Sequence, residues 1–220
     1  MLEVLYEDNH LIAINKKSGD IVQGDKTGDA PLSDFVKAYI KKKYKKPGNV
    51  FLGTIHRLDR PTSGIVLYAR TSKALSRMNA QFREKLVKKT YWAVVDNPPP
   101  NSSGRLENHL QKNQKQNKSY VTKLDGGKNA VLEYKLIKKL DNFYHLEIKP
   151  KTGRHHQIRV QLANIGCIIK GDLKYGARRS NKDASIHLLA RKIEFIHPVI
   201  KKTITITAPA PKNSVWEACS

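Results

Sequence analysis

The apolar positions near the N-terminus form two short runs and then a helical stripe. The runs at residues 4–6 and 11–15, separated by the turn formers Asp8 and Asn9, predict two strands. After Pro31 the apolar residues recur at helical spacing, which predicts an amphipathic helix that ends in a lysine-rich turn. The predicted buried stripe of this helix consists of Leu32, Phe35, Val36 and Ile40.

An uninterrupted apolar run and a second helical stripe follow. Residues 65–69 are typical of a buried strand, and Thr71 with Ser72 can cap the next helix. The predicted buried stripe of that helix consists of Leu75, Met78, Phe82 and Leu86.

Strand patterns dominate the second half of the chain. They are a strand at 88–96, an exposed hairpin or flexible excursion at 107–123, an antiparallel pair at 130–140 and 143–150, and an edge strand within 201–211. Residues 151–166 predict a loop and a short helix that ends near Asn164 or Gly166. Because strands follow one another both directly and through helices, the predicted class is α+β, with a mixed, mostly antiparallel sheet flanked by helices and loops. No repeat or linker divides the chain, so residues 1–220 are expected to form one domain.

Net charge narrows the choice of partner. Hydrophobic residues make up 39% of the 220 positions, which is enough for a globular core. The 41 lysines and arginines exceed the 19 acidic residues and give a formal charge of +22. A phosphate polymer relieves such self-repulsion, so nucleic acid is the favoured partner. A generally basic proteome and an anionic lipid surface are the alternatives.

The cysteines and the N-terminal stretch bear on the cellular compartment in which the protein is expected. Cys167 and Cys219 are far apart and form no CxxC pattern, which argues against a disulfide scaffold or a zinc finger. The acidic N-terminal stretch does not resemble a secretory signal, and apolar runs of about five residues are too short to span a membrane. We therefore expect a cytoplasmic protein without membrane contact.

One short motif carries candidate chemistry. In "HRLDRPTSG", residues 56–64, Asp59 lies between two arginines just before an apolar strand. Because Pro61, Ser63 and Gly64 are turn formers, the plain interpretation is a surface ion pair in a turn. The alternative is that Asp59 is a reactive carboxylate held ionised beside a polyanion, with Ser63 and Gly64 forming the turn that places it at the end of the strand.

Four ordered segments carry a family resemblance. They are "YEDNHLIAINKKSG", "HRLDRPTSGIVLYART", "KKTYWAVV" and "KTGRHHQIRVQLANIGCIIKGDLKYG", and the match continues through "ARKIEFIHP". Together they resemble the RluA family of RNA pseudouridine synthases, with departures from the usual family residues at Lys17, His155 and Leu189. The resemblance implies the pseudouridine synthase fold, isomerisation of a uridine in rRNA or tRNA, and no metal or organic cofactor. We also expect a monomer that lacks the extra N-terminal RNA-binding domain of many relatives.

The resemblance implies catalytic roles for three residues. Asp59 matches the carboxylate that attacks C1′, attacks the base or removes a sugar proton, and the sequence leaves these three alternatives open. Arg159 matches the basic residue that pairs with this carboxylate and keeps it ionised, and its alternatives are an ordinary phosphate contact or a charge on the helix surface. Tyr91 matches the tyrosine that packs on the flipped uracil and whose hydroxyl could carry a proton, and ordinary strand core is its alternative.

Other residues are implied in RNA binding. Arg57 matches the arginine that enters the space left by the target base. Leu188 is the candidate apolar wall under the uracil, with ordinary core as its alternative. His155 and His156 are adjacent but lack a third ligand, so they do not suggest a metal site. The remaining RNA-binding candidates are Arg60, Arg154, His156 and Gln157, which also shape their loops.

Two other functions compete with an RNA isomerase. A catalytically silent RNA-binding protein on the same fold, such as a ribosome-assembly factor, would not need a buried acidic residue beside RNA. A nuclease or glycosidase usually needs a second carboxylate or a metal, and we expect no acidic partner in the motif segments. The sequence does not specify the RNA or the uridine.

Overall fold

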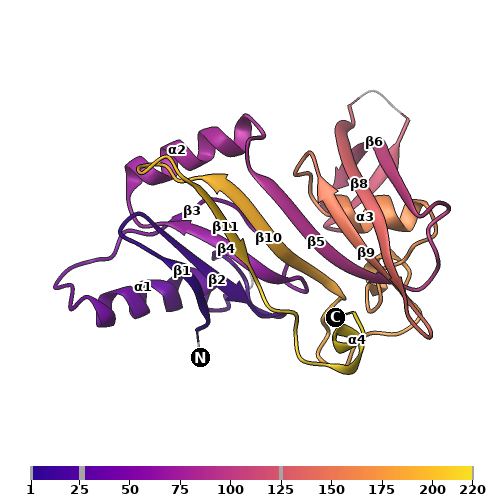
Figure 1. The fold of residues 1–220 in the computed structure, drawn as a ribbon, viewed down its shortest axis with the longest axis horizontal. Helices are drawn as coiled ribbons and strands as arrows, with labels where there is room; N and C mark the ends of the chain where they lie inside the picture. Colours follow the sequence, from indigo (N-terminus) through magenta and orange to yellow (C-terminus); the bar gives the residue numbers. More distant parts are fainter. Residues whose placement is uncertain (1, 25–27, 124–125, 220) are drawn as a thin grey trace. The chain divides into compact units, whose positions relative to one another are not determined.

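The computed structural model describes residues 2–24, 28–123 and 126–219 (Figure 1). These residues fall into two compact units, Met1–Lys88 with Ala190–Pro209 and Lys89–Leu189 with Ala210–Ser220. Each unit contains its own buried apolar clusters and its own ladder of strands. The expectation of a single domain over residues 1–220 stays a prediction.

The first unit is built on antiparallel strands. They are β1 (Val4–Glu7), β2 (Leu11–Lys16), β3 (Gly53–Thr54), β4 (Ser63–Ala69), β10 (Leu188–Ile196, from Ala190 onward) and β11 (Thr203–Thr207). The spatial order is β1-β2-β4-β10, with β3 on β4 and β11 on β10. The ladders β1–β2, β2–β4, β3–β4 and β10–β11 are antiparallel. The predicted N-terminal strand pair, the buried strand at 65–69 and the strand within 201–211 are confirmed.

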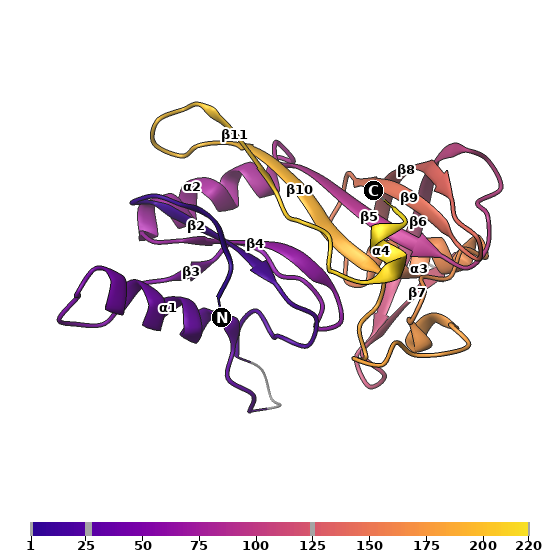
Figure 2. The ribbon, with the colours of Figure 1, turned by 60° about the horizontal axis from the view of Figure 1, so that its bottom comes forward.

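Two helices cover opposite faces of these strands (Figures 1 and 2). α1 (Leu32–Lys43) packs Val36 against the face of β4 that carries Tyr68. α2 (Ser72–Arg83) packs Met78 against the other face, which carries Leu67. Successive side chains of a strand point to opposite faces. Because a helix covers each face of β4, its run at residues 65–69 must be apolar at every position and not only at alternate ones.

Two of the predicted stripe positions are wrong. Phe35 is 57% exposed, because the buried apolar stripe of α1 runs through Leu32, Val36 and Ile40, and Phe35 lies outside it. Leu86 is 51% exposed and lies beyond the end of α2. The helix ends there because Lys85 adopts a left-handed conformation, with φ of 60°.

The second unit is also built on antiparallel strands. They are β5 (Lys88–Val95), β6 (Ser103–Asn113), β7 (Lys118–Thr122), β8 (Lys128–Lys139) and β9 (Tyr144–Pro150), in the order β5-β9-β8-β6-β7. The exposed hairpin is confirmed as β6 and β7, although β6 begins four residues before the predicted 107. The pair around Asp141 and Asn142 is confirmed as β8 and β9.

Short helical segments complete the second unit. They are α3 (Gln157–Asn164), the 3₁₀ turn η1 (Leu173–Tyr175) and α4 (Ser214–Glu217). α3 ends at Asn164 as predicted and packs Ile158 and Leu162 into the apolar cluster that includes Ile148 of β9. No helix in residues 2–24, 28–123 and 126–219 combines the length and apolarity needed to cross a membrane.

Candidate active site

The turn that carries Asp59 connects β3 to β4. The amide of Thr62 donates to the carbonyl oxygen of Asp59 at 3.0 Å, which closes the turn through Arg60 and Pro61. The prediction that Ser63 forms this turn with its neighbour Gly64 is wrong, because both residues belong to β4 and are buried. The extended strand therefore begins earlier than its apolar run. The Asp59 residue is itself half-buried.

The arginines on either side of Asp59 are exposed. Arg57 and Arg60 are both exposed to solvent. The Arg60 guanidinium lies 2.8 Å from the carboxylate of Asp29, in a pair of which both side chains are about half exposed. Such an exposed pair adds little stability, so Arg60 can exchange Asp29 for a phosphate at small cost.

A buried lysine binds the backbone of the turn that carries Asp59. Lys16 is 1% exposed, and its ammonium donates to the carbonyl oxygens of Lys17 at 2.8 Å, Arg60 at 3.0 Å and Thr62 at 2.8 Å. Burial lowers the pKa of Lys16 to about 8 despite the nearby carboxylates of Asp20 and Asp59. Sequence reasoning missed this residue, since a lysine that ends a strand usually points to solvent.

Gly64 allows β4 to approach β10 closely. Its φ is +109°, and a Cβ atom at this position would lie 2.4 Å from the carbonyl oxygen of Ala190. Only glycine fits such a backbone conformation beside a neighbouring strand. Gly64 is therefore required for the packing of β4, the strand that follows Asp59, and not for the turn itself.

The start of the motif is anchored on α2 and β4. The Nε2 atom of His56 accepts a hydrogen bond from the amide of Leu67 at 3.1 Å. The His56 ring stacks on Phe82, with a centroid distance of 5.3 Å. Both ends of the loop that carries Asp59 are thus held by buried or half-buried groups, which limits its conformational freedom.

In the second unit Tyr91 lies on β5, opposite Ile148 of β9. Tyr91 is half-buried and packs against the apolar cluster of this unit. Lys89 lies two positions earlier and so on the same face of the strand. Burial lowers the pKa of Lys89, which marks it as a second candidate polar group beside Tyr91. Sequence reasoning missed Lys89, and the period-two spacing from Tyr91 is the signal that could have found it.

Arg159 makes a buried two-pronged ion pair with Asp172. Its Nε atom lies 2.7 Å from Oδ2 of Asp172, and its Nη2 atom lies 2.8 Å from Oδ1. The two side chains are 5% and 1% exposed. Asp172, in "KGDLKYG", is thus an acidic partner of Arg159, and the expectation that the motif segments hold no acidic partner for Asp59 stays a prediction. The guanidinium of Arg159 neutralises this second carboxylate.

Gln157 and Arg154 are occupied in shaping the loop before α3. The Gln157 carbonyl accepts from the Thr152 hydroxyl at 2.7 Å and from the Arg154 amide at 3.0 Å, and its amide group donates to the carbonyl of Val131 at 3.0 Å. The exposed Arg154 side chain donates to the carbonyl of Asn129 at 2.9 Å. Both residues have the loop-shaping role expected of them, and their contact with RNA stays a prediction.

His156 and Leu188 are buried. His156 is the N-cap of α3 with φ of 54°, and its Nδ1 atom lies 2.9 Å from the Tyr175 hydroxyl. Burial, with the charge of Arg159 nearby, lowers the pKa of His156 to about 2, so its ring is neutral at physiological pH. Leu188 is 4% exposed and belongs to the apolar cluster of the second unit. Phosphate binding by a charged His156 is therefore disfavoured.

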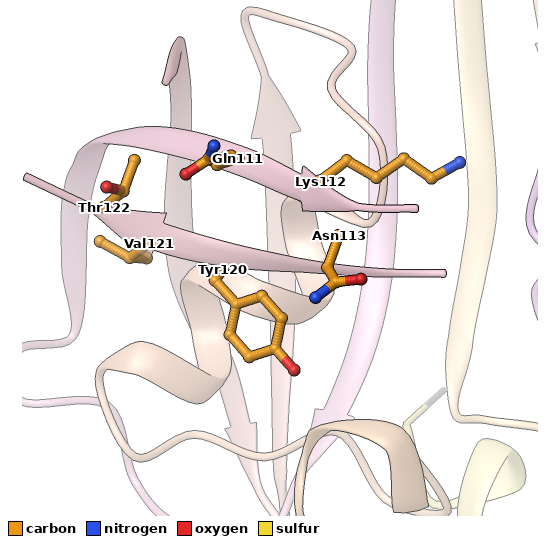
Figure 3. Close-up of a pocket in the computed structure, with 6 residues that line it drawn as sticks. All are labelled: Gln111, Lys112, Asn113, Tyr120, Val121 and Thr122. Atoms are coloured by element: carbon orange, nitrogen blue, oxygen red, sulfur yellow. The ribbon is translucent and has the colours of Figure 1, made fainter. Parts of the chain in front are cut away.

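The hairpin of β6 and β7 has a polar surface with a hollow of about 380 Å³ (Figure 3). Three consecutive residues of each strand line it: Gln111, Lys112 and Asn113 of β6, and Tyr120, Val121 and Thr122 of β7. Within the described part of the chain no group of three or more histidine, cysteine or acidic residues is arranged to hold a metal ion.

The structure divides the candidate residues between the units. Asp59, Arg57 and Arg60 lie on one loop of the first unit, and Arg154, His156, Gln157 and Arg159 lie together on the loop and first turn of α3 in the second. The pairing of Arg159 with Asp59 stays a prediction from the resemblance.

Comparison with known proteins decides the family. The family model described as RNA pseudouridylate synthase matches residues 10–164. The chain belongs to the RNA pseudouridylate synthase family. The match includes the segments that contain Asp59, Tyr91 and Arg159.

Named relatives confirm the RluA-family resemblance. "Ribosomal large subunit pseudouridine synthase C" of Vibrio vulnificus is 36% identical over 212 residues, which cover 94% of this chain and 65% of that protein. "Ribosomal large subunit pseudouridine synthase D" of Zymomonas mobilis is 31% identical over 223 residues, which cover 96% of this chain and 70% of that protein. The chain thus spans just under two thirds of the Vibrio protein's length.

Solved structures confirm the fold. "Human RNA Pseudouridylate Synthase Domain Containing 4" superposes with a TM-score of 0.81 at 23% identity, covering 97% of this chain and 90% of that one. "Human RNA Pseudouridylate Synthase Domain Containing 1" gives a TM-score of 0.76 at 21% identity, covering 100% and 87%. The α+β pseudouridine synthase fold, with mostly antiparallel strands flanked by helices, is confirmed.

Proposed function

We propose that this chain is an RNA pseudouridine synthase that isomerises a uridine to pseudouridine. In this reaction the N1–C1′ bond breaks, the uracil turns, and its C5 atom forms a new bond to C1′. The proton on C5 is then lost to water, and N1 takes up a proton. The observation that supports the proposal is the family match over residues 10–164. The reaction is an isomerisation, so it requires neither a redox centre nor an activated water.

Asp59 is the residue proposed to react with the uridine. It is the only carboxylate of the "HRLDRPTSG" motif, and the buried Lys16 holds the backbone of its turn. A rigid support of this kind suits a group that must meet one atom of a substrate. Whether Asp59 attacks C1′, attacks the base or removes a sugar proton stays open.

Arg159 and Tyr91 are proposed to assist Asp59. A guanidinium favours the ionised form of a reacting carboxylate, and a tyrosine ring can stack on a base that has left its helix. Flipping of the target nucleotide is part of the proposal, because C1′ and C5 are shielded within a stack. Arg57, exposed two residues before Asp59, is proposed to contact the RNA around the flipped base.

The proposed substrate is RNA of the large ribosomal subunit. The relatives from Vibrio vulnificus and Zymomonas mobilis are both named as synthases of that subunit. The formal charge of +22 suits a large phosphate polymer and also suits tRNA. Ribosomal RNA is therefore the first substrate to test, with tRNA beside it.

The test uses unmodified transcripts of both RNA classes labelled with tritium at C5 of uracil. Isomerisation releases this tritium to water, so wild-type protein should release it from one transcript class. Mass-neutral conversion at one uridine, located by mapping the modified RNA, completes the assignment. Binding without tritium release from any transcript or cellular RNA would favour the catalytically silent RNA-binding protein. Strand scission or free uracil would favour the nuclease or the glycosidase.

A further inference from the structure

The guanidinium of Arg159 is held on two sides by residues of one short segment. The carboxylate of Asp172 accepts hydrogen bonds from the Nε and Nη2 atoms of Arg159, at 2.7 and 2.8 Å. The ring of Tyr175 lies against its face, with 5.1 Å between Cζ and the ring centroid. One edge and one face of the planar group are thereby set, which leaves its rotation little freedom.

Tyr175 is itself fixed by hydrogen bonds. Its hydroxyl accepts from the amide of Ser119 at 3.0 Å and lies 2.9 Å from Nδ1 of His156. The residue is 8% exposed. The ring against Arg159 is therefore held by β7 and by the N-cap of α3 rather than by packing alone.

The backbone that carries Asp172 is equally constrained. Its carbonyl oxygen accepts from the amides of Tyr175 and Ala177, both at 3.0 Å. Gly171, directly before it, has φ of +88°, and a Cβ atom there would lie 2.6 Å from the side-chain amide of Asn181. The carboxylate thus projects from a tight turn that admits few alternatives.

A buried ion pair of this kind contributes little to stability, because desolvation of both charges offsets their attraction. What it does provide is orientation. A guanidinium has five donors in a fixed fork, and a carboxylate that takes one edge determines where the other donors point. We propose that Asp172 is a positioning residue of the isomerisation, setting the orientation in which Arg159 acts. This inference rests on the proposed function, in which Arg159 is the cation of the reaction.

Two variants of Asp172 test the proposal in the whole chain. Asp172→Asn keeps the shape but removes the charge, and Asp172→Glu keeps the ion pair but moves the carboxylate by one methylene. We expect kcat to fall about 100-fold in the first and about tenfold in the second, with KM for RNA changed less than about threefold. The glutamate variant keeps the test decisive if the asparagine variant fails to fold.

The control breaks a different buried ion pair. Glu7 and Arg70 lie 3.1 Å apart in the first unit, and their side chains are 8% and 7% exposed. Glu7→Gln should reduce stability in the same way as Asp172→Asn while leaving kcat within about twofold of wild type. An equal loss of kcat in Glu7→Gln and in Asp172→Asn would overturn the proposal, because the effect would then be structural.

A spectroscopic measurement follows Arg159 without reference to activity. In protein labelled with ¹⁵N-arginine, a guanidinium clamped through Nε gives a slowly exchanging Nε–H signal, assigned here by its loss in Arg159→Lys. We expect this signal to shift and to exchange faster in Asp172→Asn and to persist in Glu7→Gln. An unchanged signal in Asp172→Asn would overturn the claim that Asp172 orients Arg159.

The positioning role of Asp172 and the proposed function of the protein are tested by different outcomes. If wild-type protein releases tritium and both Asp172 variants retain its kcat, the positioning role is wrong and the proposed function stands. If wild-type protein releases no tritium from any RNA, the proposed function is wrong and so is the positioning role in it. The arginine spectra still report in that case whether Asp172 holds Arg159.

Discussion

The ammonium of Lys16 lies 2.8 Å from the carbonyl oxygen of Thr62, in the interior of the first unit. The same group reaches the carbonyl of Arg60, so one buried cation joins the end of β2 to both sides of the turn that carries Asp59. Carbonyl oxygens are weaker partners than carboxylates, and three of them are needed to replace the water that this ammonium has lost. The buried ammonium of Lys16 therefore depends on these carbonyl oxygens for its hydrogen bonds, and the turn is stabilised by them in return.

Replacement of Lys16 by methionine should lower the free energy of unfolding by about 2 kcal/mol or more, because buried carbonyl oxygens lose their donor. Chemical denaturation at pH 7 measures this loss. Lys37→Met is the control, since the Lys37 side chain on α1 is 44% exposed and its ion pair with Asp34 lies at the surface. An equal effect of the two substitutions would contradict the clamp.

The same residue predicts a pH dependence of stability. The pKa of Lys16 is about 8 in the folded protein, well below the value of about 10.4 for an unfolded lysine. Between these two pH values the unfolded chain holds a proton that the folded chain has released, so a rise in pH favours the folded state. The unfolding free energy of wild type relative to Lys16→Met should therefore increase from pH 8 to pH 10. A flat difference across that range would contradict the assignment.

Asp59→Asn should abolish isomerisation, with a loss of at least about 1,000-fold in kcat, while RNA binding is retained or strengthened. Asparagine keeps the size of the side chain, removes the reacting group and removes a charge that repels phosphate. Tritium release and a binding isotherm on the same RNA measure the two effects. Asp34→Asn, an exposed change on α1, is the control and should leave both unchanged. Substantial turnover in Asp59→Asn would exclude its catalytic role.

Gly64→Ala should destabilise the protein by about 3 kcal/mol or more, because the new Cβ atom meets the backbone of Ala190 and φ is in the left-handed region. Thermal unfolding reports the loss directly. Gly48→Ala is the matched control, since no heavy atom lies within 4 Å of a Cβ atom built there and its φ is not in that region. Equal melting temperatures for the two variants would show that β4 and β10 can separate.

The hairpin of β6 and β7 is expected to contact phosphates through its lysines. Lys112 and Lys115 are exposed, whereas Lys118 is half-buried, with its ammonium 5.1 Å from the ring centroid of Tyr175. The double change of Lys112 and Lys115 to glutamine therefore tests the surface without disturbing Tyr175. It should weaken binding to all single-stranded RNA sequences similarly and reduce the slope of log K against log salt by about 0.7 per lost contact. The kcat at saturating RNA should stay unchanged.

An unchanged salt slope in the double variant would assign these two lysines to solubility rather than to RNA. The single variant Lys118→Gln then tests whether Lys118 has a role apart from phosphate binding. A fall in kcat for this variant alone would indicate that Lys118 acts through Tyr175 and not through phosphate.

Most of the local structure of this chain could be predicted from its sequence. The buried strand β4, the start of α1 at Leu32 and the N-cap at Thr71 follow from apolar spacing and capping chemistry, which depend on neighbours within a few positions. The errors at Phe35 and Leu86 arose at the borders of helical stripes. There a change of one position, or a single left-handed residue, decides whether a side chain is buried.

The sequence by itself determined the family, the reacting candidate and the charge that suits RNA, because these properties are carried by residue identity and order. Only the tertiary structure decided what the polar side chains contact. Asp172 and Arg159 are 13 positions apart, and Lys16 reaches carbonyl groups 44 and 46 positions away. Such pairs leave no periodic trace in the sequence. Topology brings them together, and the cost of burying an unpaired charge then requires them to meet.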